Sequence, residues 1–443
     1  MSQGMFHPSE EQMAFSERAH DVIPGGAHTY SKGDDLLPVN APRGFVKGKG
    51  GRVVDLDGNE FVDWSMGIQN VLIGHAEDSI DDAVVGAIRN GQNFSRPTPL
   101  EVETAECLLA LYPWADMVKF AKNGSDANTA AIRLARSVTG RNYVAYDGTA
   151  PFLAIHDWFI GTTPVNSGIP AEISDLSISF SYNDLDSVER VFANHPERIA
   201  ALIMEVARES KPDRDFLKGV RNLCTENGAV LIFDEVVTGF RYHLSGAHAL
   251  FGVQPDLMSV GKGLGNGYSV TALVGRRHLM ERGGIRHSQE RVFLMSTTNG
   301  AEQSALAAGL ATIGFYRSNP VIERIWETGR ALMDGINRIT ADFGIQGFLF
   351  AQSDFACRPV VHTLDSTRQP SAEYRTLFLQ ELIKKKVFMP WICPAFRHAS
   401  KDLEQTFYAV NFACESYRTA LEKKSVDGLL VGRPVKAVFR KWN

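Results

Sequence analysis

The sequence has 443 residues, of which 44% are hydrophobic and 22% are charged, as expected for a globular protein with a sizeable core. The formal net charge of -5 and the pI of about 6.2 give no reason to expect nucleic-acid binding. Five scattered cysteines without CxxC spacing argue against a disulfide framework or a metal site and favour a reducing cytoplasm. The N-terminus lacks a signal-peptide pattern, and no apolar run approaches membrane-spanning length.

The first 60 residues predict a starting helix, a Pro24-Gly25-Gly26 turn and a hairpin through residues 51–63 with its turn at Asp57-Gly58-Asn59. The chain is longer than a usual single domain, so we expect one large and one smaller domain. We place an N-terminal segment at residues 1–60, a large domain at 61–315 and a small domain at 316–443.

Strand and helix patterns alternate through the expected large domain, which predicts the α/β class with a mostly parallel sheet covered on both faces. After a long helical run from Ala301, the chain shifts to helix-and-hairpin patterns that are typical of a smaller α+β domain. The clearest strand patterns lie at residues 199–204, 230–233 and 271–274, and the clearest helical patterns at 126–137 and 216–226.

The block Lys122-Asn123-Gly124-Ser125-Asp126 precedes a helical run and has the composition of an anion cradle. Gly124 allows close approach of the backbone, and Ser125 is predicted to cap a helix whose free amides point at the anion. Taken alone, the same residues could be simply a good helix cap. No complete nucleotide-binding glycine pattern is present here or around Lys262.

An acid and an amine are each predicted to follow a buried strand. Asp234 follows the apolar run 230–233, and Lys262 follows the run 257–260, so both should emerge at the carboxyl edge of the sheet. That pairing suits pyridoxal phosphate, which needs a lysine for a Schiff base and a carboxylate to keep its pyridine nitrogen protonated. The alternative, two solvated acids and an unrelated loop lysine, is credible for either piece alone but not for both.

With these motifs the chain resembles the class III (fold type I) pyridoxal-phosphate aminotransferases, in the branch close to glutamate-1-semialdehyde aminomutase. The resemblance runs from about Pro24 to His398 and rests on the Asp-Glu-Val-x-Thr-Gly-Phe-Arg block at Asp234 and the Gly-Lys-Gly-Leu-Gly block at Lys262. It implies that Asp234 binds the pyridine nitrogen and that Lys262 holds the cofactor. It also implies that the N-terminal segment packs with the small domain.

The resemblance implies further cofactor contacts. Phe152, aligned through His156-Asp157-Trp158, would stack on the ring. Val236 would cover the other face in preference to Val237, because it lies two residues after Asp234 and points to the same side of an extended chain. Thr297 or Thr298 of a neighbouring subunit would bind the phosphate, which implies a homodimer with shared active sites; the same residues could also cap the helix that follows.

The substrate is less well defined by the sequence. The family arginine after the Pro-Gly-Gly turn is replaced by Lys32, and the Ser-Trp pair before Gly-His is replaced by Gly67-Ile68, which argues against glutamate semialdehyde as substrate. Glu205 matches a family acid near the substrate. The other candidate polar residues, each of which could instead be an ordinary surface or interdomain contact, are His28, Tyr30, Lys32, Arg96 and Arg397.

The expected activity is transamination. Lys262 would release the cofactor to a primary amine or amino acid donor and then act as general acid and base, and a small polar aldehyde or ketone would be the acceptor. An intramolecular aminomutase and an ammonia-lyase would use the same lysine and aspartate, so both stay open. A catalytically silent binding subunit is disfavoured because Lys262 is present.

Overall fold

The computed structural model describes residues 6–213 and 215–442, which form two units. The first contains the chain up to Glu77 together with Glu323–Arg440, and the second contains Asp78–Ile322. These boundaries lie at 77 and 322, where the sequence patterns predict 60 and 315. The N-terminal boundary lies later because the strand at Glu60–Asp63 pairs with strands of the first unit.

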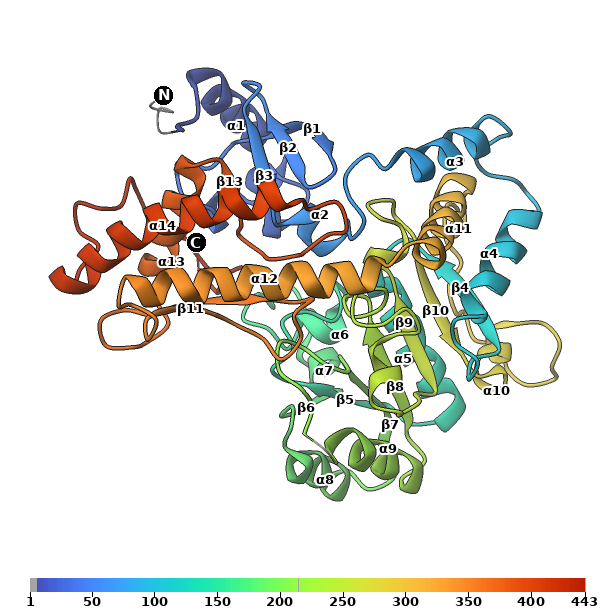
Figure 1. Ribbon diagram of the computed structural model, residues 1–443. Helices are drawn as coiled ribbons and strands as arrows, with labels where there is room; N and C mark the ends of the chain where they lie inside the picture. The colour runs from blue at the N-terminus through green and yellow to red at the C-terminus, as the bar shows by residue number, and fades with distance from the viewer. Residues whose placement is uncertain (1–5, 214, 443) are drawn as a thin grey trace. The chain divides into compact units, whose positions relative to one another are not determined.

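A seven-stranded sheet organises the second unit (Figure 1). In spatial order its strands are β4 (Met117–Ala121), β10 (Thr271–Gly275), β9 (Leu257–Val260), β8 (Val230–Glu235), β7 (Ile199–Met204), β5 (Tyr143–Asp147) and β6 (Ser177–Phe180). β10 runs antiparallel to both of its neighbours, and the other neighbouring pairs are parallel. The predicted α/β class with a mostly parallel sheet is confirmed.

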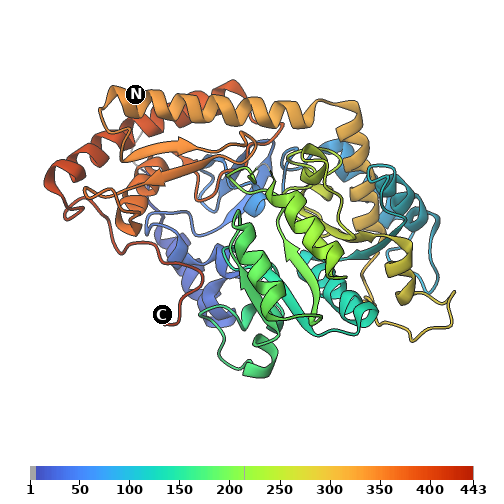
Figure 2. The same cartoon turned by 90° about the horizontal axis from the view of Figure 1, so that it is seen from below.

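Helices lie on both sides of this sheet (Figure 2). Every residue of β7 and β8 is buried, which explains the continuous apolar sequence of β7 and of the first four residues of β8, before Asp234 and Glu235. None of the helices in the described ranges is both long and apolar enough to cross a membrane. The helices of this unit are α3 (Asp78–Ile88), α4 (Pro99–Leu109), α5 (Gly124–Thr139), α6 (Asp157–Ile160), α7 (Ala171–Ser174), α8 (Leu185–Asn194), α9 (Phe216–Glu226), α10 (Arg277–Met280) and α11 (Gln303–Ser318).

The first unit contains a four-stranded sheet in the order β1 (Phe45–Lys49), β2 (Arg52–Asp55), β3 (Glu60–Asp63) and β13 (Val387–Phe388). β2 and β3 form the predicted hairpin, with Gly58 in its turn at a φ of 81°. A second pair of strands is β11 (Leu349–Gln352) and β12 (Val360–Thr363). The helices are α1 (Glu10–Val22), α2 (Met66–Gln69), α12 (Val321–Asp342), α13 (Ala372–Lys384) and α14 (Ser400–Lys423).

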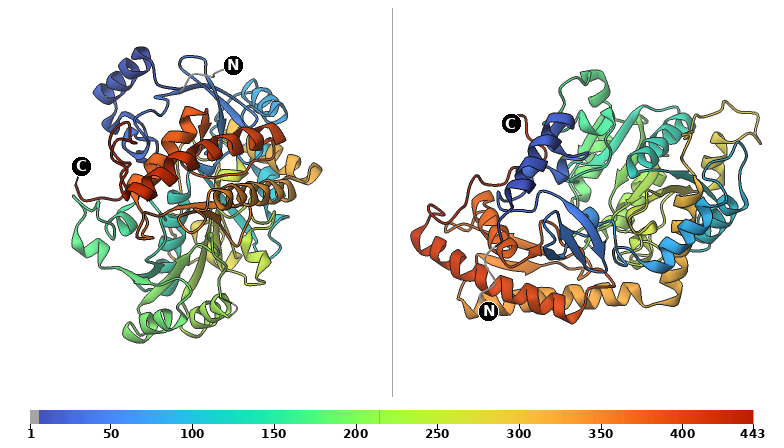
Figure 3. Two further views of the ribbon diagram at one scale, coloured as in Figure 1. Left: turned by 60° about the vertical axis from the view of Figure 1, so that its left-hand side comes forward. Right: turned by 90° about the horizontal axis from the view of Figure 1, so that it is seen from above.

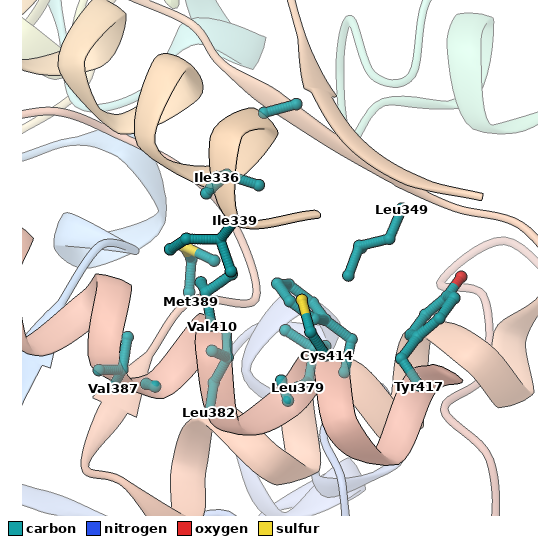
Figure 4. Close-up of a cluster of buried hydrophobic side chains, with 14 of the residues drawn as sticks. Ile336, Ile339, Leu349, Leu379, Leu382, Val387, Met389, Val410, Cys414 and Tyr417 are labelled. Atoms are coloured by element: carbon teal, nitrogen blue, oxygen red, sulfur yellow. The ribbon is translucent and has the colours of Figure 1, made fainter. Parts of the chain in front are cut away.

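The core of the first unit is built by the three long helices and β11. Helices α12 and α14 run side by side in both views of Figure 3. Apolar side chains from α12, α13, α14 and β11 meet between them (Figure 4). Burial of such side chains stabilises a fold by about 1.5–3 kcal/mol each. Labelled members of this cluster are Ile336, Ile339, Leu349, Leu379, Leu382, Val387, Met389, Val410, Cys414 and Tyr417.

Candidate active site

Two parallel strands of the second unit deliver an acid and an amine to one edge of the sheet. β8 and β9 pair with Asp234 opposite Ser259, and Lys262 begins the short 3-10 helix η5 (Lys262–Leu264) just after β9 ends. Lys262 has a positive φ of 40°, which is uncommon outside glycine and is found at functional sites. The charge of Lys262 lowers the pKa of Asp234, so the two groups lie within electrostatic reach.

Hydrogen-bond donors surround the Asp234 carboxyl, which is only 6% exposed. One carboxyl oxygen, Oδ2, accepts from Asn128 Nδ2 at 2.7 Å. The other, Oδ1, accepts from the backbone N–H of Val236 at 3.0 Å and more weakly from Ser259 Oγ at 3.4 Å. These contacts fix the orientation of the carboxyl group.

The ionisation of Asp234 is set by burial. Desolvation and the nearby carboxylate of Glu205 raise the pKa of Asp234 to about 7, against the lowering effects of its hydrogen-bond donors and of Lys262. A buried carboxyl with a pKa near neutrality is stabilised as the anion by an additional cation placed against it. A protonated ring nitrogen would supply that cation.

The predicted anion cradle has a different cap from the one expected. Asn123, not Ser125, caps α5: the side-chain Oδ1 of Asn123 accepts from the backbone N–H of Asp126 at 3.0 Å. Ser125 lies inside the first turn, where its Oγ accepts from the backbone N–H of Ile155 at 3.0 Å. Because helix periodicity alone cannot choose between neighbouring polar residues, the cap prediction was wrong by two positions. The N–H groups of the first turn still point out of the helix end.

Val236 lies where three elements meet. A Cβ atom on Gly124 would lie 2.6 Å from Val236 Cγ2, and one on Gly261 would lie 3.4 Å from Val236 Cγ1. Val236 therefore packs between the start of α5 and the residue that precedes Lys262. The half-buried Val236 also donates its backbone N–H to Asp234, so its position is tied to that of the acid.

Phe152 lies in an irregular segment after β5 and before α6. Its side chain is 43% exposed and meets the ring of Phe159 edge-on, with centroids 5.9 Å apart. The next two residues, Leu153 and Ala154, are fully buried and hold the segment in place next to the exposed Phe152. Phe152 is therefore not a core residue.

Thr297 and Thr298 are both exposed, in the segment that leads into α11. The carbonyl of Thr297 accepts from the backbone N–H of Gly300 at 3.2 Å, and the carbonyl of Thr298 accepts from Asn93 Nδ2 at 2.9 Å. Both hydrogen bonds use the carbonyl of the threonine and not its hydroxyl. Neither threonine caps α11, because the residue at its N-cap is Glu302.

The candidate substrate residues of the second unit differ in setting. Glu205 directly follows β7, is 3% exposed and acts electrostatically on Asp234. Arg96 is exposed in the loop between α3 and α4. Glu205 therefore belongs to the surroundings of the buried acid, whereas Arg96 is a solvent-exposed loop residue.

The other candidates belong to the first unit. Tyr30 and Lys32 lie in the 3-10 helix η2 (Tyr30–Lys32) and are exposed, as is the neighbouring His28. Arg397 already has an anionic partner, because its Nε and a terminal nitrogen donate to the two carboxylate oxygens of Glu77 at 2.8 and 3.0 Å. A guanidinium held in this bidentate way would have to exchange Glu77 for a substrate carboxylate.

Asn128 is a site residue that the sequence analysis missed. It is fully buried in α5, four residues after Gly124 and therefore on the same helix face. Its Nδ2 donates to Asp234 and also to the backbone carbonyl of Leu153 at 2.8 Å. The available signal was a polar residue at helical spacing from the predicted cradle on an otherwise apolar face.

A second missed feature anchors the loop that follows Asp234. The next residue, Glu235, is fully buried and accepts from His248 Nδ1 at 2.8 Å. Trp114 Nε1 donates to His248 Nε2 at 3.0 Å, and an indole N–H can only donate. His248 therefore accepts at Nε2 and carries its proton on Nδ1. This chain of bonds ties the loop after β8 to Trp114.

These residues fit pyridoxal phosphate. The first-turn N–H groups at the start of α5 could bind an anion, Asp234 could pair with a ring cation, and Lys262 supplies an amine at the same sheet edge. Clusters of three or more side chains suited to a metal ion are absent from the ranges that the structure describes.

Comparison with known proteins agrees with this geometry. The sequence model of the family described as aminotransferase class-III matches residues 37–346. The chain is 32% identical over 413 residues to 3-aminobutyryl-CoA aminotransferase of Cloacimonas acidaminovorans (strain Evry), covering 90% of this chain and 95% of that protein. It is 34% identical over 418 residues to glutamate-1-semialdehyde 2,1-aminomutase of Syntrophobacter fumaroxidans, with the same coverage of both chains.

The fold is also similar to that of solved structures. The PLP internal aldimine form of the FumI protein from Sphingopyxis sp. MTA144 superposes with a TM-score of 0.84 at 25% identity, covering 96% of this chain and 99% of that one. The expected fold type I architecture is thereby confirmed.

Proposed function

The chain belongs to the class-III aminotransferase family and uses pyridoxal phosphate as its cofactor, and we propose that it moves an amino group from a primary amine or amino acid to a small polar aldehyde or ketone. One observation carries this proposal. Asp234 lies near the carboxyl end of β8 and Lys262 follows the adjacent parallel strand β9, and Asp234 is buried with a pKa of about 7.

Lys262 is the proposed catalytic amine. Bound in this site, pyridoxal phosphate would supply an electron-accepting ring that stabilises negative charge at the carbon that loses a proton. Lys262 Nζ would hold the cofactor covalently at rest and, once displaced by the donor amine, take that proton and return it elsewhere. Asp234 would keep the ring nitrogen protonated, and the Asn128 and Val236 N–H donors would keep Asp234 aimed at it.

The remaining contacts to the cofactor are proposed from where each residue lies in the fold. The backbone at Gly124 and the hydroxyl of Ser125 would bind the phosphate, since a serine hydroxyl that accepts from Ile155 still has a proton to donate. Phe152 and Val236 would cover the two faces of the ring. Exposed threonines at 297 and 298 support a homodimer in which each subunit lends a hydroxyl to its partner's phosphate site.

The residues proposed to contact the substrate are supported by different observations. Glu205 is supported by its place beside Asp234, whereas Tyr30, Lys32, Arg96 and Arg397 are supported by the family resemblance alone. We also propose a cytoplasmic location, because all five cysteines are free and four of them are buried.

An intramolecular aminomutase is the second candidate, favoured by the relative at 34% identity that carries that name. The two activities differ in stoichiometry. A transaminase consumes a donor and an acceptor in separate half-reactions, whereas an aminomutase isomerises one compound without a partner. The replacement of the family arginine by Lys32 disfavours the aminomutase.

The test is a donor panel with the purified holoenzyme. Amines, amino acids, and 3-amino acids with their thioesters are mixed singly with the protein while its visible cofactor absorption is followed. A donor should bleach this absorption, and a carbonyl acceptor should restore it. When the donor is a ¹⁵N-labelled amine, the label should appear in the aminated acceptor. Isomerisation of glutamate semialdehyde without any acceptor would favour the aminomutase. If none of the donors in the panel bleaches the cofactor absorption, the proposal is contradicted.

A further inference from the structure

Asn128 connects three parts of the candidate site. It stands on α5, the helix whose N-terminus forms the anion cradle. Its side-chain Nδ2 donates one hydrogen bond to Asp234 Oδ2 at 2.7 Å and another to the backbone carbonyl of Leu153 at 2.8 Å. Leu153 directly follows Phe152, so one buried side chain joins the cradle helix, the acid and the segment that carries the aromatic ring.

The orientation of this amide is determined by its partners. Both groups that face Asn128 Nδ2 are acceptors, so a flipped amide would place its oxygen against a carboxyl oxygen and a carbonyl oxygen. Oδ1 of Asn128 is buried and accepts no hydrogen bond from the described part of the chain. An unsatisfied buried acceptor costs about 1–3 kcal/mol, so the fold retains Asn128 despite a local penalty.

We propose that Asn128 is a positioning residue for the reaction, which acts through Asp234 by aiming its carboxylate at the ring nitrogen and by stabilising its charged form. This inference rests on the proposed function, in which Asp234 serves the cofactor. An amide suits the role because it offers two donors and no charge. An aspartate at the same place would repel Asp234, and a leucine would offer no donor.

The electrostatics agree with this geometry. Hydrogen bonding from Asn128 lowers the pKa of Asp234, whereas burial and Glu205 raise it. Lys262 is the other charged group acting on Asp234, and it also lowers the pKa. Loss of the Asn128 donor should therefore shift the protonation of Asp234 upward even in protein without cofactor.

The first test is the titration of Asp234 in protein stripped of pyridoxal phosphate. The carboxyl infrared band that disappears in Asp234→Asn identifies this group. The midpoint of the Asp234 titration should rise by about 1–2 pH units in Asn128→Leu and in the nearly isosteric Asn128→Asp. A shift of this size corresponds to the loss of one hydrogen bond to a charged group. Asn227→Leu removes a similar amide bond, from Asn227 Nδ2 to the Leu223 carbonyl at the C-terminal end of α9, and should leave the midpoint unchanged. An unchanged midpoint in both Asn128 variants would overturn the proposal.

The second test measures the affinity for pyridoxal phosphate by equilibrium dialysis. Asn128→Leu should weaken binding about 10-fold, the equivalent of 1.4 kcal/mol. The same change made in Asp234→Asn should weaken it no further, because the acid through which Asn128 acts is gone. Additive losses would show a merely structural role and overturn the proposal. If Asp234→Asn itself binds and turns over normally, the proposed function of Asp234 fails, while the infrared midpoint still decides the role of Asn128.

Discussion

Gly124 and Val236 are packed so closely that a single added carbon would not fit between them: a Cβ on Gly124 would lie 2.6 Å from Val236 Cγ2. The two residues come from different elements, the start of α5 and the loop after β8. Their contact places the proposed anion cradle against the residue whose N–H donates to Asp234. The cradle and the acid are therefore coupled by packing.

Gly124→Ala should weaken cofactor retention and lower the free energy of unfolding by about 1–3 kcal/mol, since overpacking forces side chains or backbone to move. Urea unfolding and equilibrium dialysis of pyridoxal phosphate would measure both effects. Gly86→Ala is the matched control, because a Cβ there meets nothing within 4 Å and its site is the interior of α3. That control should be slightly more stable than the parent. Equal behaviour of the two variants would contradict the packing argument.

Lys262→Ala should retain the fold and bind pyridoxal phosphate only reversibly, with no turnover. The reason is that no amine would remain at the end of β9 to hold the cofactor or move the proton. Borohydride reduction followed by mass spectrometry should find the cofactor on residue 262 of the parent and nowhere in the variant. Lys218→Ala, which removes an exposed lysine of α9, is the control and should keep the covalent link. An adduct on another lysine in the parent protein would refute the assignment.

Asp234→Asn should lose activity by several powers of ten while keeping its fold. A neutral amide cannot stabilise a protonated ring nitrogen, and removing one partner of a buried charge pair costs about 3–5 kcal/mol. Steady-state rates with a donor found in the panel would measure the loss. A variant with a near-normal rate would mean that another acid serves the ring.

Asp234→Asn, which should lower the activity, should nevertheless raise the free energy of unfolding of the cofactor-free protein at high pH. The pKa of Asp234 is raised from 3.8 to about 7, so the folded state binds its proton more tightly than the unfolded state does. The contribution of this group to stability therefore falls as pH rises from about 4 to about 7. Stripped Asp234→Asn should equal the parent near pH 4 and exceed it by up to roughly 4 kcal/mol at pH 8, from about three pKa units at 1.36 kcal/mol each. Urea unfolding at both pH values checks the sign, and a more stable parent at pH 8 would contradict it.

Replacing both Thr297 and Thr298 by alanine should weaken cofactor retention, because the proposed phosphate site would lose a partner's hydroxyl. Mixing this variant with Lys262→Ala should restore part of the activity, since one site of each hybrid dimer would combine an intact lysine with intact threonines. Subunit exchange is verified with differently tagged chains. Exchanged mixtures that stay as inactive as their parents, or an active monomer in sedimentation, would rule out the shared site.

The sequence alone determined the sheet class and predicted that Asp234 and Lys262 stand at the carboxyl edge of the sheet. Both follow from local patterns: continuous apolar runs predict buried parallel strands, and the residue after such a run stands at the carboxyl edge of the sheet. The run at 199–204 and the helix at 216–226 match β7 and α9 residue for residue. The adjacency of β8 and β9, which brings the two motifs together, is a result of the tertiary structure.

Only the tertiary structure decided which side chains surround the acid. Asn128 reaches Asp234 across 106 residues of sequence, and Arg397 reaches Glu77 across 320. The choice of Asn123 over Ser125 as the cap of α5 also depended on Ser125 finding a partner in Ile155, thirty residues away. Periodicity places a residue on a face of its own element, but a hydrogen bond also depends on which distant donor or acceptor the fold brings within about 3 Å.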